Sequence, residues 1–218
     1  KATTAGLTSA CSNGITLSPG TATKLAFATA PTSTGSAGSP LADQPVVEVR
    51  DANDNVVTGA TDAVTITAAT NVAGCGTPAA GTVLATTNPV TASSGVATFA
   101  GLGYTKAEAM RFKASSGSLT AACSSAVTIS HGPASILGYA TQPAGSNKIC
   151  TDFTTQPAVE ILDAYANRCT SNTDTIALSL YTNSACTTAA GAGSAINGTS
   201  SLAATAGLAT FAGLDANL

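Results

Sequence analysis

The chain has 218 residues, of which 9% are charged and 4% are aromatic, and it contains no Trp. Eight basic residues against eleven acidic ones give a net charge of −3, which excludes the basic surface that nucleic-acid binding requires. No run approaches the roughly 18 consecutive apolar residues of a membrane-spanning helix, so a membrane span is not expected.

Short runs in which apolar and polar residues alternate with a period of two predict β-strands along the chain. Turn-forming stretches separate them, at residues 51–55, 88–89, 93–95 and 116–117. No stretch keeps a 3.6-residue apolar period, so an all-β fold is predicted. In chain order the alternating apolar positions are Leu25 and Phe27, Val47 and Val49, Val64 and Ile66, Met110 and Phe112, Val127 and Ile129, and then Ile176, Leu178 and Leu180.

The chain repeats itself with an offset of 112 residues, measured between Cys11 and Cys123 (123 − 11). Segment 113–132 restates segment 1–20, segment 156–163 restates 44–51, and segment 207–214 restates 95–102. A fixed internal period indicates an array of similar folding units. With about seven short strands for each unit, we predict tandem antiparallel β-sandwiches of immunoglobulin-like type.

Four segments resemble bacterial immunoglobulin-like repeats of the invasin and intimin kind: Lys24-Leu-Ala-Phe with Pro31, Val47 to Val56, Val64-Thr-Ile, and Gly95-Val-Ala-Thr-Phe. Such repeats form the stalks of surface adhesins and other large extracellular proteins. The resemblance covers the whole chain and implies a structural role at the cell surface or outside the cell. The usual turn in these repeats is Asp-Ala-x-Gly-Asn. Here Asp54 replaces the glycine, and the second copy reads Asp163-Ala-Tyr-Ala-Asn167, which alters the turn but not the fold.

The repeat divides the chain into three parts. Residues 21–131 hold a complete unit, called unit one, and residues 132–218 hold unit two, which stops before its last two strands. Residues 1–20 match those two terminal strands, as part of a preceding or neighbouring unit.

A sandwich without two strands exposes its core and unpaired edges, so the missing strands must come from elsewhere. Residues 1–20 of the same chain would have to reach across the whole of unit one, so we expect the corresponding segment of another copy, added head-to-tail by strand complementation. The alternative is that the 218 residues are a window on one long tandem polypeptide. Both arrangements produce a fibre of stacked sandwiches.

Six cysteines without a CxxC motif or a Cys/His cluster indicate disulfides, and hence an oxidising, extracytoplasmic setting. Cys75 and Cys123 both belong to unit one and are predicted to pair. Cys186 is the counterpart of Cys75 with a shift of one residue, and Cys11 holds the place of Cys123. We therefore expect Cys186 to bond Cys11 of the next copy.

Two further cysteines, Cys150 and Cys169, lie in unit two opposite Gly38 and Val57 of unit one. By elimination they are predicted to pair with each other. They flank a predicted strand, however, and at opposite ends of it they would be too far apart for a disulfide. Free or mispaired thiols are therefore the alternative.

No constellation of residues predicts catalysis or a cofactor, so the chain is not expected to be an enzyme. His131 is the one histidine, which leaves no Ser-His-Asp set and no zinc site. Asp51, Asn53 and Asp54 offer oxygens that could bind calcium. The preferred interpretation is a polar hairpin turn, because unit two keeps Asp163 but has neither Asn53 nor Asp54 at the corresponding positions.

Two functions are compatible with these features. The preferred one is a structural subunit or repeat of an extracellular filament or stalk, whose partners are other copies of itself. The alternative is an adhesin module that binds a host surface or a glycan. Tyr165 and Tyr181 favour that alternative weakly, because unit one has Asn53 and Ala69 in their places and an aromatic platform suits glycan binding.

Overall fold

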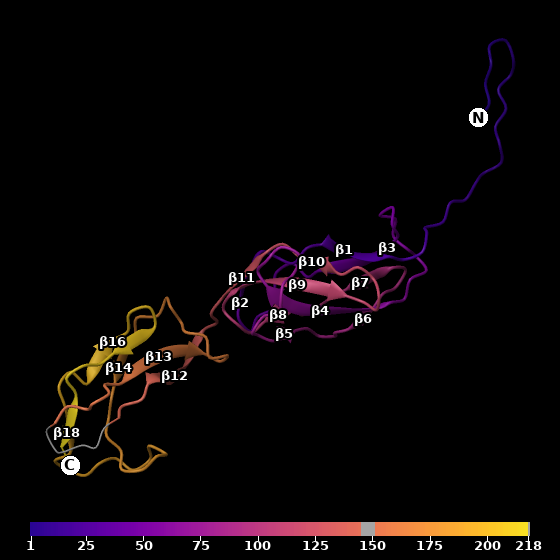
Figure 1. Cartoon of the computed structure of the whole chain (residues 1–218). Coiled ribbons are helices and arrows are strands. Elements are labelled where there is room, and N and C mark those ends of the chain that lie inside the picture. The colour runs from indigo at the N-terminus through magenta and orange to yellow at the C-terminus, as the bar shows by residue number, and fades with distance from the viewer. Residues whose placement is uncertain (145–150, 218) are drawn as a thin grey trace.

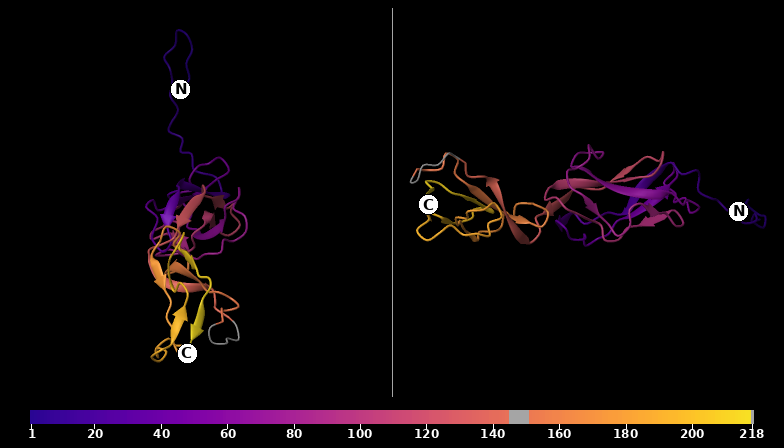
Figure 2. Two further views of the ribbon diagram at one scale, coloured as in Figure 1. Left: turned by 90° about the vertical axis from the view of Figure 1, so that its left-hand side faces the viewer. Right: turned by 90° about the horizontal axis from the view of Figure 1, so that it is seen from below.

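The computed structural model describes residues 1–144 and 151–217 (Figure 1). This part of the chain contains 18 strands, and the predicted all-β fold is confirmed. Among these residues there is no helix, and so no helix that could cross a membrane. The strands form six sheets. Units one and two lie end to end (Figure 2).

Unit one contains eleven strands rather than about seven, because several of them are only two or three residues long. The strands predicted around Leu25, Val47, Val64, Met110 and Val127 are β1, β3, β4, β9 and β11. The bounds are β1 Lys24–Thr29, β2 Thr34–Ser36, β3 Val46–Arg50, β4 Ala63–Thr70, β5 Val83–Leu84, β6 Val90–Thr91, β7 Val96–Thr98, β8 Gly103–Tyr104, β9 Ala109–Ser115, β10 Ala122–Cys123 and β11 Val127–Ser130.

Two sheets of unit one face each other across a shared core. One has the order β1-β3-β7, and the other has the order β2-β11-β9-β4-β6, with β10 paired to β9. Alternating apolar side chains from both sheets meet between them and are almost completely buried, as the period of two predicts. The most deeply buried members are Val47 and Val49 of the first sheet and Val64, Ile66, Met110, Phe112 and Val127 of the second.

The pairing of β2 differs from the expected antiparallel arrangement, because β2 runs parallel to β11. The chain leaves β1 at Thr29, passes Pro31 and joins the edge of the opposite sheet as β2. Proline has no N–H to continue the ladder with β3, so the first strand ends there. β1 therefore pairs antiparallel with β3 in the first sheet, and its continuation β2 pairs parallel with β11 in the second.

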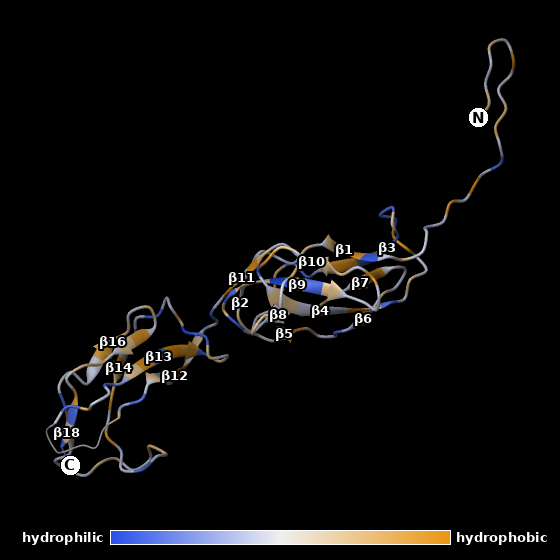
Figure 3. Cartoon of the chain, in the orientation of Figure 1, coloured by the Kyte–Doolittle hydropathy of each residue, from blue (hydrophilic) through white to orange (hydrophobic). Residues whose placement is uncertain are grey.

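Unit two repeats part of this plan around a smaller core that includes Val159, Ile161, Ile176, Phe211 and Leu214. Its sheets are β12-β13-β17, β14-β16 and β15-β18. The bounds are β12 Ala134–Thr141, β13 Ala158–Asp163, β14 Thr175–Ala177, β15 Ala195–Asn197, β16 Ser201–Ala203, β17 Leu208–Thr210 and β18 Asp215–Asn217. Apolar residues dominate β13 and β14, whereas β18 is largely hydrophilic (Figure 3).

The strand predicted over Ile176 to Leu180 is shorter than expected, because β14 ends at Ala177. Its counterpart β4 continues to Thr70, and six of its residues pair with β9. No strand of the described residues takes the place of β9 beside β14, which pairs only with β16. The counterparts of β9, β10 and β11 would all lie beyond Asn217, so these three strands of unit one have no equivalent among the described residues of unit two.

Residues 1–20 extend away from unit one outside any strand, and every one of them is exposed (Figures 1 and 2). They correspond to residues 113–132, which contain the end of β9, then β10 and β11.

Candidate functional site

Unit two has an open apolar groove at the place where β9, β10 and β11 cover unit one. Leu137 of β12 is 60% exposed, whereas Leu25, which lies 112 residues earlier in β1, is only 5% exposed. Leu137 and Tyr139 of β12 line a groove of about 530 Å³ with Ile176 of β14 and with residues farther along the chain, including Tyr181 and Cys186. The apolar lining indicates that another segment belongs there.

The edge of β12 also lacks main-chain partners that β1 has. The N–H of Leu25 donates to the Thr120 carbonyl, and the Thr120 N–H donates to the Thr23 carbonyl, both at 2.9 Å. The corresponding N–H of Leu137 has no such acceptor among the described residues. An unpaired strand edge of this kind is a template for another chain segment.

The exposed N-terminal segment carries the side chains that would fill this groove. Ile15 and Leu17 are 80% and 89% exposed, whereas their counterparts Val127 and Ile129 of β11 are 0% and 3% exposed. Leu7 is likewise exposed, and its counterpart Leu119 packs against the core of unit one. Exposed aliphatic side chains on an extended segment gain free energy when an apolar face covers them.

The N-terminal segment already has the local hairpin of its counterpart. Ala2 and Ala10 exchange two main-chain hydrogen bonds, of 2.8 and 3.1 Å. In unit one the residues 112 positions later, Ala114 and Ala122, face each other in the same way where β9 pairs with β10. The segment therefore already has this part of the conformation of its counterpart.

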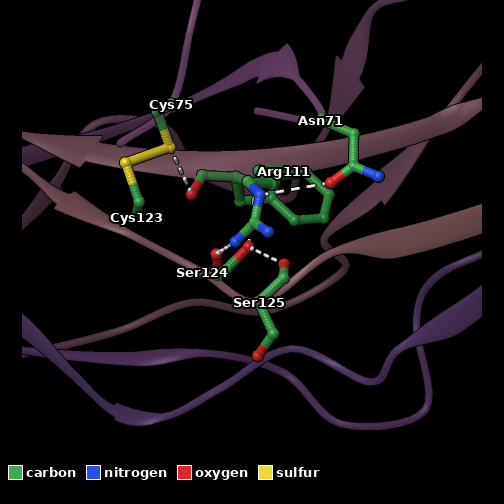
Figure 4. Close-up of a disulfide and its surroundings, with 7 residues drawn as sticks. Asn71, Cys75, Arg111, Cys123, Ser124 and Ser125 are labelled. Carbon is green, nitrogen blue, oxygen red and sulfur yellow. Dashed lines mark hydrogen bonds between the residues drawn. A yellow bond between two sulfur atoms is a disulfide. The ribbon is translucent and has the colours of Figure 1, made fainter. Parts of the chain in front are cut away.

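The expected disulfide between Cys75 and Cys123 is present, with the two Cα atoms 5.7 Å apart (Figure 4). It joins the loop after β4 to β10. Beside it, the guanidinium of Arg111 donates to Asn71 Oδ1 and to the Ser124 carbonyl. These contacts fix β9 and β10 to the loop after β4, so the disulfide lies at the seam that is open in unit two.

Cys186 has the backbone conformation of its counterpart Cys75. Both residues have left-handed backbones, with φ of 51° and 55°. Each closes a similar turn, because the Cys186 N–H donates to Asn183 and the Cys75 N–H donates to Val72, three residues earlier in both cases. Cys186 and Cys11 are both exposed and unpaired within the described residues, and their bond between copies stays a prediction.

Cys150 lies outside the described residues, so its pairing with Cys169 also stays a prediction. Cys169 is buried beside the segment that links the two units, with its Sγ 3.8 Å from the Gly132 carbonyl oxygen. Burial, followed by the negative charge of Asp163, raises the pKa of the Cys169 thiol. Among the described residues, the nearest bridged pair around Cys150 is formed by Ala144 and Thr155. This pair lies after the end of β12 and before the start of β13.

The residues considered for calcium binding form a hydrogen-bonded turn. Asp51 is buried, and its Oδ1 accepts the N–H groups of Asn53 and Asn55, each at 2.9 Å. Its Oδ2 accepts the Gly20 N–H at 2.8 Å and the Asn55 amide at 3.0 Å. These oxygens therefore face N–H donors. Hydrogen bonds from the Asn55 side chain and from Gly20 hold the pKa of Asp51 at about 2, below its usual value of 3.8.

Asp54 faces two cations rather than the carboxylate of Asp51. Its Oδ1 lies 3.0 Å from Lys24 Nζ and 3.6 Å from Arg50 Nη1. Lys24, and then Arg50, lower the pKa of Asp54. Together with the N–H donors around Asp51, these positive charges give the loop the character of a structural turn rather than of a calcium site.

Tyr165 and Tyr181 lie in different places. Tyr165 packs against Gly38 of unit one, where an added Cβ would clash with its ring, and Tyr181 lines the groove of unit two. The structure does not bring them into one aromatic platform.

Asn167 is a contact residue that the sequence patterns did not reveal. Its side chain hydrogen-bonds main-chain atoms of unit one, and only its recurrence as Asp-x-x-x-Asn in both units could have drawn attention to it.

Comparison of the chain with protein-family models and with curated proteins gave no match.

Proposed function

We propose that this chain is a structural subunit or repeat of an extracellular filament or stalk, assembled head-to-tail by strand complementation and disulfides. The observation that carries the proposal is the match between two exposed surfaces, the groove of unit two and residues 1–20. Unit one contains counterparts of both, already packed together.

The apolar contacts supply the driving force for this assembly. Covering a large aliphatic side chain contributes about 1.5–3 kcal/mol, so Ile15 and Leu17 provide a substantial part of the binding free energy. Leu137 and Tyr139 lose their exposure on the other side of the same contact. Main-chain hydrogen bonds to β12 and β14 then set the register, as in other complexes in which a strand is added to a sheet edge.

The contact is directional, because the N-terminal segment of one copy enters unit two of another. Such a heterologous contact leaves one free groove and one free segment at the ends of every assembly, so it propagates as a fibre. Where the units belong to one longer polypeptide, the same segment follows unit two in the chain and completes it in the same way.

Disulfides support an extracellular site of action. The Cys75–Cys123 bond belongs to oxidising compartments, and Cys11 and Cys186 would place an equivalent bond at each junction between copies. The left-handed conformation of Cys186 matches that of Cys75, so the loop that carries it is preorganised for this bond.

A non-reducing denaturing gel of native material tests the proposal. Separate chains should give a ladder with steps of one chain mass, 21.0 kDa, that collapses on reduction. Cys11→Ser and Cys186→Ser should each abolish the ladder, and Cys169→Ser is the matched control that should keep it. A single very large species that reduction does not change would identify repeats of one polypeptide. Monomers in both lanes, without fibres under the electron microscope, would contradict the proposal.

A further inference from the structure

The contact between units one and two depends on the side chain of Asn167. Its Nδ2 donates to the Thr105 carbonyl at 2.8 Å, and its Oδ1 accepts the Ala107 N–H at 2.9 Å. A second bond from Nδ2 reaches Asp163 Oδ2 at 2.9 Å. Asn167 is 6% exposed, so its amide is satisfied across the joint and removed from water.

Asp163 ties the same joint to the linking segment. Its Oδ2 accepts the Gly132 N–H at 2.7 Å, and its Oδ1 accepts the N–H groups of Tyr165 and Asn167. Burial alone would raise the pKa of Asp163, but these hydrogen bonds outweigh it and leave the pKa lowered. One carboxylate thus holds the linker, the loop and the asparagine that reaches unit one.

The head of unit one, defined here as Gly20 with residues 51–55, has the same arrangement without a neighbour. Asp51 holds the Gly20 N–H and the Asn55 amide as Asp163 holds Gly132 and Asn167. Asn55 is nevertheless exposed, and no donor of the described residues contacts its Oδ1. The hydrogen-bonding groups around Asp163 and Asn167 are therefore repeated around Asp51 and Asn55, although Asn53 stands in the place of Tyr165.

The end of unit two resembles the end of unit one that Asn167 binds. Asn217 lies 112 residues after Thr105; it is the last residue of β18, and Thr105 directly follows β8. Asn217 Oδ1 accepts the Ala195 N–H at 2.8 Å, and Thr105 Oγ1 accepts the Thr82 N–H at 2.8 Å. The two donors differ by one residue in the 112-residue repeat, because Thr82 corresponds there to Ser194. Both bonds nevertheless place the side chain against the partner strand at the same end of the unit, so the carbonyl of Asn217 lies at the end that corresponds to the Thr105 carbonyl.

The geometry points to a second contact between copies, in which the head of unit one receives the end of unit two of the preceding copy. Asn55 Nδ2 donates to the main-chain oxygen of Asn217, in the way that Asn167 binds Thr105. The inference rests on the proposed strand complementation, which brings the two surfaces together because Gly20 is the last residue of the donated segment. The bond between copies then repeats the bond from Asn167 to Thr105 within a copy.

Thiol accessibility tests this contact. The variant is Asn55→Cys, and the measurement is the rate at which the new thiol is alkylated. We expect this rate to be about tenfold lower in the fibre than in dilute single chains. The single chains also carry Cys11→Ser and Cys186→Ser, which prevent the disulfide between copies. The matched control is Asn167→Cys, whose thiol should react at the same rate in both states, because its joint lies within a single chain. A second alkylation under denaturing, non-reducing conditions distinguishes a protected thiol from a newly formed disulfide.

Fibre stiffness provides a measurement that keeps the native cysteines unchanged. Asn55→Ala and Asn167→Ala should both shorten the persistence length seen in electron micrographs, by similar factors, while the covalent ladder persists. One outcome would overturn the contact and leave strand complementation intact. In that outcome the ladder forms, the thiol at position 55 reacts fast in the fibre, and Asn55→Ala fibres keep their stiffness. Failure to form any fibre or ladder would overturn the proposed function and this contact together.

Discussion

Leu25 and Leu137 hold the same position in the two units, yet one is 5% exposed and the other is 60% exposed. The difference comes from a covering segment that unit one contains and unit two lacks. A peptide of residues 1–20 should therefore bind the chain when its own N-terminal segment has been removed, and should raise the unfolding temperature of unit two. Calorimetric titration and thermal unfolding measure both effects.

The matched control for that experiment is the same peptide with Ile15→Asp and Leu17→Asp. Burying two carboxylates in an apolar groove is strongly unfavourable, so this peptide should not bind measurably. Equal binding by both peptides would show that the groove does not recognise the aliphatic side chains.

Removal of the internal disulfide should destabilise unit one without changing its fold. The bond closes a loop with a sequence separation of 48 residues, for which the chain-entropy model gives about 4 kcal/mol. We expect Cys75→Ser with Cys123→Ser to lower the free energy of unfolding by that amount in urea titrations. Reduction of the unaltered chain should reproduce the loss, and a difference between the two would indicate that the substituted side chains themselves matter.

Acid should weaken the head of unit one through Asp51. The pKa of Asp51 in the folded chain is about 2, below the usual 3.8, so the folded state binds this proton less tightly than the unfolded state. Its contribution to stability is therefore complete above about pH 4 and is lost as the pH falls from 3.8 towards 2. Denaturation curves between pH 5 and pH 2 measure this loss.

Asp51→Asn is the informative variant for the acid experiment, since it keeps the shape of the side chain and cannot titrate. Its stability should change less than that of the unaltered chain over the same pH range. A parallel acid profile in the variant would assign the loss to other carboxylates, among them Asp163, whose pKa is also lowered.

Asn167→Ala should loosen the joint between the units locally. The substitution removes two bonds to unit one and leaves the Ala107 N–H without its acceptor, at a cost of about 1–3 kcal/mol. Hydrogen exchange at the Ala107 amide should become about 10–100 times faster, while amides within β9 remain protected. Asn172→Ala is the control, because the Asn172 side chain bonds only to Asp174 within its own turn.

The all-β fold and most strands of unit one could be predicted, because alternating residues such as Val47, Val49, Val64 and Ile66 fill one continuous core. The length of β14 could not be predicted, since the pattern at Leu178 and Leu180 describes a strand whose neighbour is missing. The short strand β10 has too few residues to show any period.

The candidate site was predicted in part. The repeat relates residues 1–20 to residues 113–132 by identical spacing, and the bridge between Ala2 and Ala10 has its counterpart in the pair Ala114 and Ala122. That these residues complete unit two stays a prediction. The Asn167 contact was missed, since its partners are main-chain atoms of residues 105 and 107, which leave no side-chain signal. The loop at Asp51 suggested calcium ligands because a pattern of oxygens does not reveal the N–H groups that surround them.

The end of unit one offers Asn167 only a carbonyl oxygen and an N–H group. Since every residue except proline presents these two groups, the side chains at positions 105 to 107 are free to vary without altering the bonds. One kind of head can therefore accept ends of different sequence, such as those that close units one and two. An array built on this joint can mix non-identical units, and the outer surface of the fibre can diversify while its connections stay the same.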